Sequence, residues 1–329
     1  MIVKTMTAEE VWKYYQKDIA AAEQRIKETL GTVAPAISMV GRHLLEGGGK
    51  RIRPLLAILS SKISGYIGEK SSILACCAES IHTASLLHDD VVDGANMRRG
   101  QPSAHSLWGN QIAVLVGDYL YSNALWLANS FQSQKIMDAL ANATVKMSEG
   151  ELIQLSKKGS PDISEENYMN IIKGKTAILM SAACRCGAVL ASAPQEKENA
   201  LELFGLKLGM AFQMADDILD YMAEEKTLGK NLGKDIEEGK ITLPLIYLLR
   251  EASPDEVEKV RTIIKAEELT KEDLSYILDL LNKYKSIEKS YEKANAILNE
   301  AKAELDIFED SMEKTALLAI SDYSLRREK

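Results

Sequence analysis

The sequence predicts an all-α fold, and three observations support this prediction. Apolar residues recur at helical spacing along the 329-residue chain, and no convincing run of period-two alternation is present. Hydrophobic residues make up 46% of the chain, enough to bury a large core. No Pro-, Gly- or Ser-rich linker divides the chain. We therefore expect a single domain over residues 1–329, built as a helical bundle.

Composition excludes several classes of protein. The net charge of −8 and the pI of about 5.3 argue against a general nucleic-acid binder. Charges interrupt the longest apolar runs well before ~20 residues, so we expect no transmembrane span. The first ten residues lack the pattern of a secretory signal peptide. The cysteines lie in apolar surroundings and are predicted to be buried, reduced thiols, which suits the cytoplasm: Cys76, Cys77, Cys184 and Cys186.

The first helices are bounded by recognisable signals. Thr7 and Glu10 form a capping-box pattern, which predicts a helix from there to about residue 30. The next helix is predicted over residues 32–45, and it stops at the glycine run 47–49.

A basic loop follows, with the sequence Gly-Lys-Arg-Ile-Arg-Pro, and leads into a helix predicted over residues 55–63. A glycine-rich turn at a helix start offers backbone N–H groups to an anion. Lys50, Arg51 and Arg53 add fixed positive charge. We therefore expect the loop to bind a phosphate, with a plain basic surface loop as the alternative.

The first aspartate motif comes at the end of a helix that begins near Lys70. It contains Asp89, Asp90 and Asp93. On a helix, Asp89 and Asp93 share a face, where like charges repel unless a cation lies between them. Magnesium takes oxygen ligands of this kind, often together with substrate phosphates. The motif therefore predicts a metal site.

The second motif repeats the same spacing 127 residues later, with Asp216, Asp217 and Asp220. It too follows an apolar run, residues 208–215. A single such triplet could be a solvated helix end, but two copies at the ends of apolar helices are hard to explain in that way. We interpret the two motifs as two walls of one metal site.

Other features lie between and after these motifs. His82 is two turns before Asp89 and could donate to a diphosphate, although a lone histidine on a helix is usually a core residue. His88 is interpreted as structural. Helices are predicted over residues 106–130 and 134–157. Gly174 lies inside the next helical segment, which indicates a kink or a close approach there. A charged loop then carries Lys230, Lys234 and Lys240, and the remaining residues are expected to form outer helices.

The motifs together resemble those of the trans-polyprenyl diphosphate synthases, most closely the long-chain octaprenyl type, over nearly the whole chain. The resemblance rests on six segments, which are 49–54, 88–93, 97–100, 175–176, 212–220 and 239–244. It implies an isoprenoid-synthase type of all-α bundle around a deep central cavity, and usually a homodimer.

The resemblance also implies roles for individual residues. About three magnesium ions would bridge the aspartate motifs to the diphosphate of an allylic substrate, with Asp89 and Asp93 holding two and Asp216 the third. Contacts to the allylic diphosphate would come from Arg98, Lys175, Gln213 and Lys230. Contacts to isopentenyl diphosphate would come from Lys50, Arg53, His82 and Arg99. Lys240 is a further substrate-binding candidate. Lys175, Thr176 and Gln213 would face the allylic cation.

Product length is argued from the helix before Asp89. In short-chain members of the family, bulky aromatic residues four or five positions before the motif close the cavity, and here those positions are Ser85 and Ala84. The next positions along the stripe are Ile81, Ala78 and Cys77. Because one helical turn of ~5.4 Å is comparable to an isoprene unit, we expect about seven to nine units. Candidates for the cavity floor are Tyr119, Tyr121 and Trp126, on the segment 114–127.

Alternative functions differ in what they require. A His-Asp metal phosphohydrolase would need more histidine ligands than the four histidines present. A terpene cyclase would not need the second diphosphate site of Lys50, Arg53 and Arg99. A non-catalytic subunit would be expected to lose an aspartate motif, yet both motifs are intact. A geranylgeranyl or shorter-chain synthase, and a catalytic subunit that depends on a partner, stay open.

Overall fold

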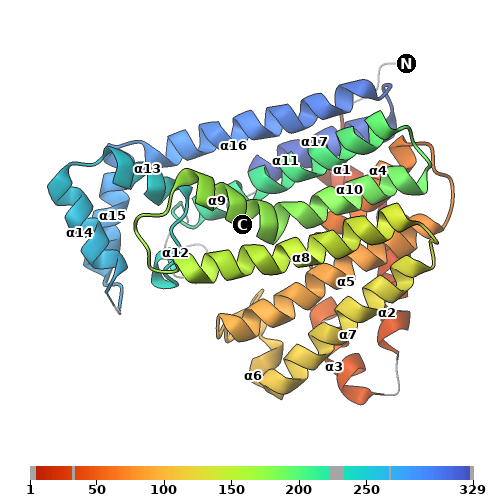
Figure 1. The fold of residues 1–329 in the computed structure, drawn as a ribbon, viewed down its shortest axis with the longest axis horizontal. Helices are drawn as coiled ribbons and strands as arrows, with labels where there is room; N and C mark the ends of the chain where they lie inside the picture. The colour runs from red at the N-terminus through yellow and green to blue at the C-terminus, as the bar shows by residue number, and fades with distance from the viewer. Residues whose placement is uncertain (1–4, 32–33, 223–232, 267, 327–329) are drawn as a thin grey trace. The chain divides into compact units, whose positions relative to one another are not determined.

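The computed structural model describes residues 5–31, 34–222, 233–266 and 268–326 (Figure 1). These residues are almost entirely helical, which confirms the all-α prediction. The elements are α1 (Ala8–Tyr14), α2 (Gln16–Leu30), α3 (Pro35–Glu46), α4 (Ile52–Ile63), α5 (Lys70–Val92), β1 (Met97–Arg98), β2 (Gln101–Pro102), α6 (Ala104–Trp108), α7 (Asn110–Asn129), α8 (Gln134–Lys157), α9 (Glu165–Ile172), the π-helix η1 (Lys173–Ala177), α10 (Ile178–Leu190), α11 (Gln195–Leu219), α12 (Lys234–Glu237), α13 (Leu243–Glu251), α14 (Pro254–Ile264), α15 (Lys271–Lys283), α16 (Ser286–Ala303), the 3-10 helix η2 (Glu304–Ile307) and α17 (Met312–Arg326).

The chain forms two compact units. Of the described residues, unit 1 contains those within 1–144, 179–205 and 305–320, and unit 2 contains those within 145–178, 206–304 and 321–329. The expectation of a single domain over the whole chain, and that of a deep central cavity, stay predictions. No helix among the described residues is both long and apolar enough to span a bilayer.

Unit 1 is built around α5, which packs against α2, α4 and α7. Figure 1 shows α5 and α7 side by side. Their shared core contains Ala84 and Leu87 of α5 with Val116 and Leu120 of α7. Gly117 allows this approach, because a Cβ atom there would lie 2.2 Å from Nε2 of His88. His88 therefore packs into the α5–α7 interface, in agreement with its interpretation as structural.

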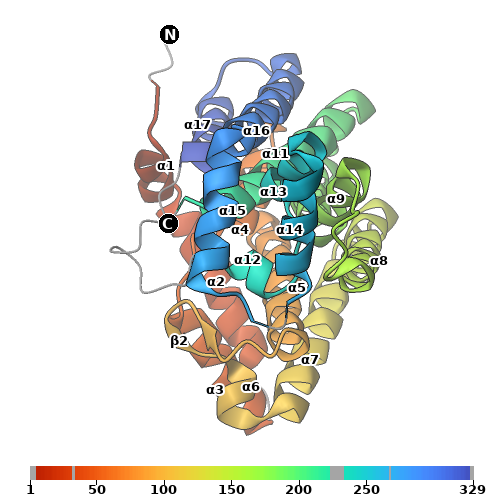
Figure 2. The ribbon, with the colours of Figure 1, turned by 90° about the vertical axis from the view of Figure 1, so that its left-hand side faces the viewer.

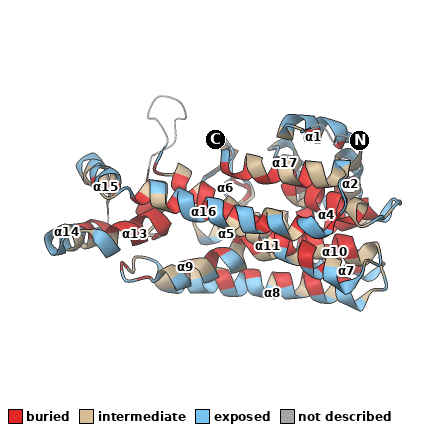
Figure 3. Cartoon of the chain, turned by 90° about the horizontal axis from the view of Figure 1, so that it is seen from above, coloured by how far each residue is buried: buried red, intermediate tan, exposed pale blue. Residues whose placement is uncertain are grey.

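Unit 2 contains the C-terminal helices, in which α13 packs against α15 and α16 (Figure 2). The buried residues of α16 recur at helical spacing along one face, and Figure 3 shows buried and exposed residues interleaved along this helix. These residues are Ser286, Ser290, Ala294, Leu298 and Ala301. This segment therefore forms an amphipathic helix, as the charge and apolar pattern predicts.

Several predicted boundaries were wrong. The helix predicted from residue 7 to 30 breaks at Tyr15, whose ring is buried and whose hydroxyl donates to Glu313 at 3.3 Å. The helix predicted over 106–130 begins at Ala104 and breaks at Gly109, which has a φ of 85°. The helix predicted from Leu55 begins at Ile52, because proline is tolerated in a first turn.

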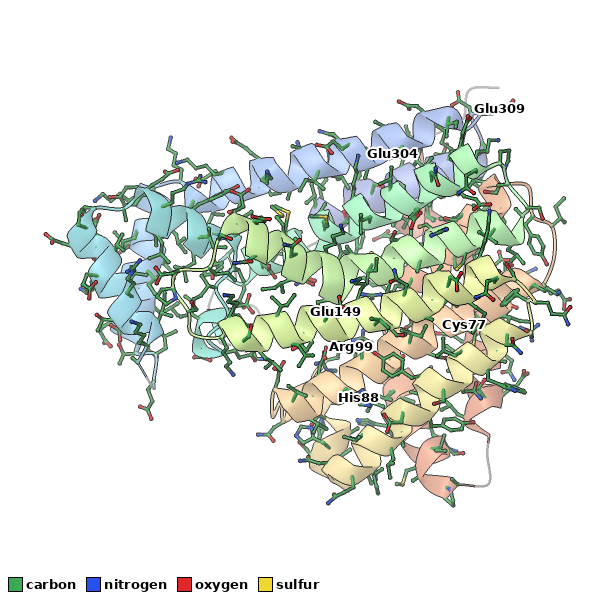
Figure 4. All side chains as sticks on the ribbon, in the orientation of Figure 1. Cys77, His88, Arg99, Glu149, Glu304 and Glu309 are labelled. Carbon is green, nitrogen blue, oxygen red and sulfur yellow. The ribbon has the colours of Figure 1, made fainter. Side chains whose placement is uncertain are left out.

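The cysteine prediction was correct on burial. All four cysteines are free and buried in unit 1. Burial raises the pKa of Cys77 well above its ordinary value, so the thiol is chemically quiet. Cys77 and His88, both labelled in Figure 4, lie toward opposite ends of α5.

Candidate active site

The first aspartate motif ends α5. The N–H of Asp93 donates to the carbonyl of Asp89 at 2.8 Å, so helical geometry continues through the motif. Asp89 and Asp93 are half-buried and one turn apart, whereas Asp90 is only 1% exposed. The outer two aspartates therefore share a face, as predicted, while the middle one faces the protein interior.

Asp90 accepts a hydrogen bond of 2.6 Å from Nε of Arg98. Burial raises the pKa of Asp90, although the Arg98 charge opposes the shift. Arg98 belongs to a hairpin of two short strands, β1 and β2. Its two-residue turn is Arg99–Gly100, with φ values of 50° and 75°. Two positive φ values in succession are typical of a type I′ turn, so Gly100 was a signal for this hairpin.

The predicted isopentenyl diphosphate residues lie in the same unit as this hairpin. Lys50 is exposed on the loop between α3 and α4, and Arg53 is on the first turn of α4. His82, from α5, has a pKa held well below its ordinary value, first by burial and then by Arg53 and Arg99. The neutral imidazole beside these guanidinium groups leaves a net positive site, which suits a diphosphate.

The second aspartate motif ends α11 in unit 2. As in the first motif, the two outer aspartates and the middle one differ in burial. Asp216 and Asp220 are half-buried, whereas Asp217 is buried. The hydroxyl of Tyr168 donates to Oδ2 of Asp217 at 2.6 Å, and Nε2 of Gln213 donates to its Oδ1 at 2.8 Å. Burial raises the pKa of Asp217 to about 7, against the effect of these two hydrogen bonds. Both oxygens of Asp217 therefore have protein partners.

Gln213 also connects the motif to the π-helix. The hydroxyl of Thr176 donates to Oε1 of Gln213 at 2.7 Å. Thr176, Gln213, Asp217 and Tyr168 thus form one hydrogen-bonded chain, which fixes the orientation of the Gln213 amide. The sequence did not indicate Tyr168, because it lies 49 residues from Asp217 and carries no motif of its own.

Lys175 and Lys240 each have an acidic partner. Nζ of Lys175 lies 2.6 Å from Oε2 of Glu151 on α8, and Nζ of Lys240 lies 2.6 Å from Oε2 of Glu238. A small cavity of about 110 Å³ in unit 2 is lined by both lysines and by Gln213. Lys230 lies outside the described residues.

Gly174 has the close approach that the sequence predicted. A Cβ atom on it would lie 2.9 Å from the carbonyl oxygen of Lys146 and 3.0 Å from Cα of Gly150, both on α8. The helix is π-helical here, over Lys173–Ala177. Such bulges inside helices are frequent at functional sites, since they re-aim side chains and backbone carbonyls.

The predicted chain-length residues lie along α5. Ala84, Ile81 and Ala78 are fully buried, and the half-buried Ser85 donates to the carbonyl of His82 at 2.8 Å. Tyr121 packs against the core cluster that contains Ala84.

The other two floor candidates are placed differently. Tyr119 donates to the carbonyl of Thr29 at 2.8 Å, and Trp126 is 71% exposed. Trp126 therefore lines no interior space of unit 1, and Tyr121 is the best placed of the three.

Magnesium was predicted from the aspartate motifs. In the ranges that the structure describes, no group of three or more His, Cys, Asp or Glu side chains is arranged to hold a metal ion alone. Magnesium, however, is commonly held by one or two carboxylates and completes its shell with water and substrate phosphates. The half-buried pair of Asp89 and Asp93 on one helix face fits such an ion.

Comparisons with known proteins agree with this arrangement. A family model described as Polyprenyl synthetase matches residues 34–281. The octaprenyl diphosphate synthase of Escherichia coli is 38% identical over 324 residues, covering 98% of this chain and 100% of that protein. The short chain isoprenyl diphosphate synthase of Methanothermobacter thermautotrophicus is 36% identical over 326 residues, covering 97% of this chain and 99% of that protein.

A solved structure is equally similar. The polyprenyl synthase of Caulobacter crescentus, complexed with calcium and isoprenyl diphosphate, has a TM-score of 0.92 and 36% identity, with 99% of each chain covered. These similarities extend over nearly the whole chain, and the range matched by the family model contains both aspartate motifs. The chain therefore belongs to the polyprenyl synthetase family, and it is a prenyltransferase of the trans-polyprenyl diphosphate synthase class.

Proposed function

We propose that the chain adds isopentenyl diphosphate units head to tail to an allylic diphosphate, farnesyl or geranylgeranyl, and forms an all-trans product of about seven to nine isoprene units, octaprenyl favoured. The product length is inferred from the series of small residues along α5. Ala84, Ala78 and Cys77 are small and fully buried on the turns before Asp89. In this proposal, a growing tail that runs along α5 passes these small side chains, with Ile81 between them.

The allylic diphosphate is bound in this proposal by both aspartate motifs, through about three magnesium ions. Bound magnesium would stabilise the negative charge that develops on the departing diphosphate. Asp89, Asp93 and Asp216 would hold the ions. Arg98, kept in place by Asp90, and Lys175 would contact the diphosphate directly.

The bonds broken and formed in this reaction balance, and no further reactant is needed. The allylic carbon–oxygen bond breaks, and its electron pair leaves with the diphosphate. The double bond of isopentenyl diphosphate attacks the resulting allylic cation and forms the new carbon–carbon bond. A proton is then lost, and the released diphosphate accepts it. Thr176 and Gln213 would face the cation, and the site would have to exclude water, which would otherwise trap the cation.

We infer self-association as well. Helix α7 exposes Leu115 at 66% and Trp126 at 71%, which is costly for large apolar side chains left in water. A second copy of the chain packed on α7 would cover them. We therefore propose that the chain works as a homodimer, with dependence on a different subunit as the alternative, and we propose the cytoplasm as its location. The product would be delivered to the membrane, with no transmembrane segment needed.

A shorter product is the second candidate, because a short chain isoprenyl diphosphate synthase is 36% identical to this chain. The deciding experiment is a product assay. Purified protein is incubated with magnesium, farnesyl diphosphate and labelled isopentenyl diphosphate, and the dephosphorylated products are sized by chromatography. Polyprenols near eight units support the long-chain proposal. Products of twenty carbons or fewer contradict the argument from Ala84, and no incorporation by folded protein points to a missing subunit.

A further inference from the structure

The loop between α3 and α4 has an unusual backbone conformation. Gly48 and Gly49 have φ values of 72° and 140°, and Arg51 has a φ of 49°. A non-glycine residue with positive φ stores conformational energy, so its surroundings must compensate. The neighbours of Arg51 identify what holds the loop.

Arg51 is buried and makes ion pairs with two other helices. Its Nε donates to Glu23 of α2 at 2.8 Å, and its Nη1 donates to Glu79 of α5 at 3.0 Å. Nη1 also lies 3.3 Å from the carbonyl oxygen of Gly48. Burial alone would lower the pKa of Arg51, but the two carboxylates outweigh it and raise the pKa. The guanidinium therefore stays charged and is directed at protein acceptors.

Trp12, which precedes Lys50 by 38 residues, also holds the loop. Its indole N–H donates to the carbonyl of Lys50 at 2.6 Å, across 38 residues. Trp12 is on α1, which begins with the capping box of Thr7 and Glu10 that the sequence predicted. The first helix of the chain is thus hydrogen-bonded to the basic loop.

Gly49 and Arg99 make further contacts within this loop and with it. A Cβ atom on Gly49 would lie 2.7 Å from Nη1 of Arg99 and 3.1 Å from Nη1 of Arg51. Arg99, labelled in Figure 4, also donates to the carbonyl of Gly48. The loop therefore packs against two guanidinium groups, and the φ of 140° at Gly49 favours glycine at this position.

We propose that Arg51 and Trp12 are positioning residues that hold this loop so that Lys50 and Arg53 meet isopentenyl diphosphate in one fixed geometry. The inference rests on the proposed function of Lys50 and Arg53. Neither positioning residue touches the substrate. Arg51 acts through the Gly48 carbonyl and Trp12 through the Lys50 carbonyl, and a preformed clamp loses less entropy on binding than a mobile one.

The sharpest test is Trp12→Phe, which keeps an aromatic side chain and removes the N–H donor. We expect the KM for isopentenyl diphosphate to rise about fivefold, as one net hydrogen bond would give. The kcat and the KM for farnesyl diphosphate should stay unchanged. Tyr14→Phe, on the same helix and 61% exposed, is the matched control and should change none of these values. Equal changes in both KM values, or a loss of kcat alone, would overturn the proposal.

Arg51→Lys is the second variant, because lysine keeps the charge but cannot pair with Glu23 and Glu79 at once. We expect an increase in the same KM of about tenfold or more. The unfolding temperature of this variant is measured first. If the variant does not fold, the proposal is tested with Trp12→Phe alone.

Titration calorimetry with isopentenyl diphosphate, and with inorganic diphosphate as a probe, separates this proposal from the proposed function. A wild-type chain that makes no polyprenol but binds these ligands more tightly than Trp12→Phe supports positioning alone. A wild-type chain that binds neither ligand overturns both proposals.

Discussion

Nε of Arg98 donates a hydrogen bond of 2.6 Å to Oδ1 of Asp90, a carboxylate that is 1% exposed. Successive residues of a helix point about 100° apart, so Asp90 cannot share the face of Asp89 and Asp93. Asp217 has the same place in the second motif, where it accepts hydrogen bonds from Tyr168 and Gln213. In each motif, the middle aspartate therefore orients a neighbouring polar side chain.

This geometry predicts different effects for Asp90→Asn and Asp93→Asn. Asp90→Asn removes the charge that holds Arg98, so the KM for the allylic diphosphate should rise by about tenfold or more, as loss of a charge-assisted hydrogen bond implies. The magnesium concentration for half-maximal rate should stay the same. Asp93→Asn should raise that magnesium concentration. Steady-state kinetics over a magnesium series measure both, and an equal magnesium shift in the two variants would contradict the division of roles.

Ala84→Phe should shorten the product. Its side chain would obstruct the proposed path of the tail along α5, and chromatography of the dephosphorylated products measures the change. Because Ala84 is fully buried beside Val116 and Leu120, overpacking should also cost about 1–3 kcal/mol of stability. Ser85→Phe, at a half-buried position, serves as the second variant. An unchanged product from both folded variants would refute this path for the tail.

Gly150→Ala should disturb the π-helix. A Cβ atom there would lie 2.8 Å from the backbone nitrogen of Lys175, so α8 and η1 would have to separate. We expect a loss of about 1–3 kcal/mol in the free energy of unfolding, together with a lower kcat because Lys175 and Thr176 move. Asn142→Ala, at an exposed position of α8, is the control for helix substitution. Denaturant unfolding and steady-state rates provide the measurements, and wild-type values for Gly150→Ala would contradict the close contact.

His82 should make the substrate-free protein less stable below pH 6.5. Its pKa in the folded chain is lowered by burial and by the nearby arginines. Below pH 6.5 the unfolded chain therefore binds a proton that the folded chain does not bind. The stability contributed by this group is present above the unfolded pKa of about 6.5 and is lost as pH falls below it. At pH 5.5 the loss should be about 1 kcal/mol.

His82→Gln should reduce this pH dependence, and His43→Gln is the control. Unfolding curves at pH 5.5 and 7.5 give the difference for each protein. If His82→Gln retains the full wild-type slope, another group is responsible for it.

Features that depend only on residues close together in the sequence were predictable. The capping box of Thr7 and Glu10 and the bounds of α8 agree with the sequence pattern, because caps and helical periodicity depend on neighbours within one or two turns. The break at Tyr15 was not predictable in this way. It depends on burial of the ring and on Glu313, which is 298 residues away in the sequence.

The sequence by itself determined the helical class, the family, and the shared face of the outer aspartates in each motif, since helix geometry alone requires that face. The tertiary structure decided what the middle aspartates and the basic loop contact. Asp217 meets Tyr168 across 49 residues, and Lys50 meets Trp12 across 38. Such pairs form only when helices pack, because the hydrogen bonds join side chains whose separation no local periodicity encodes. Helix packing therefore fixes the orientation of the side chains in the two aspartate motifs and in the basic loop.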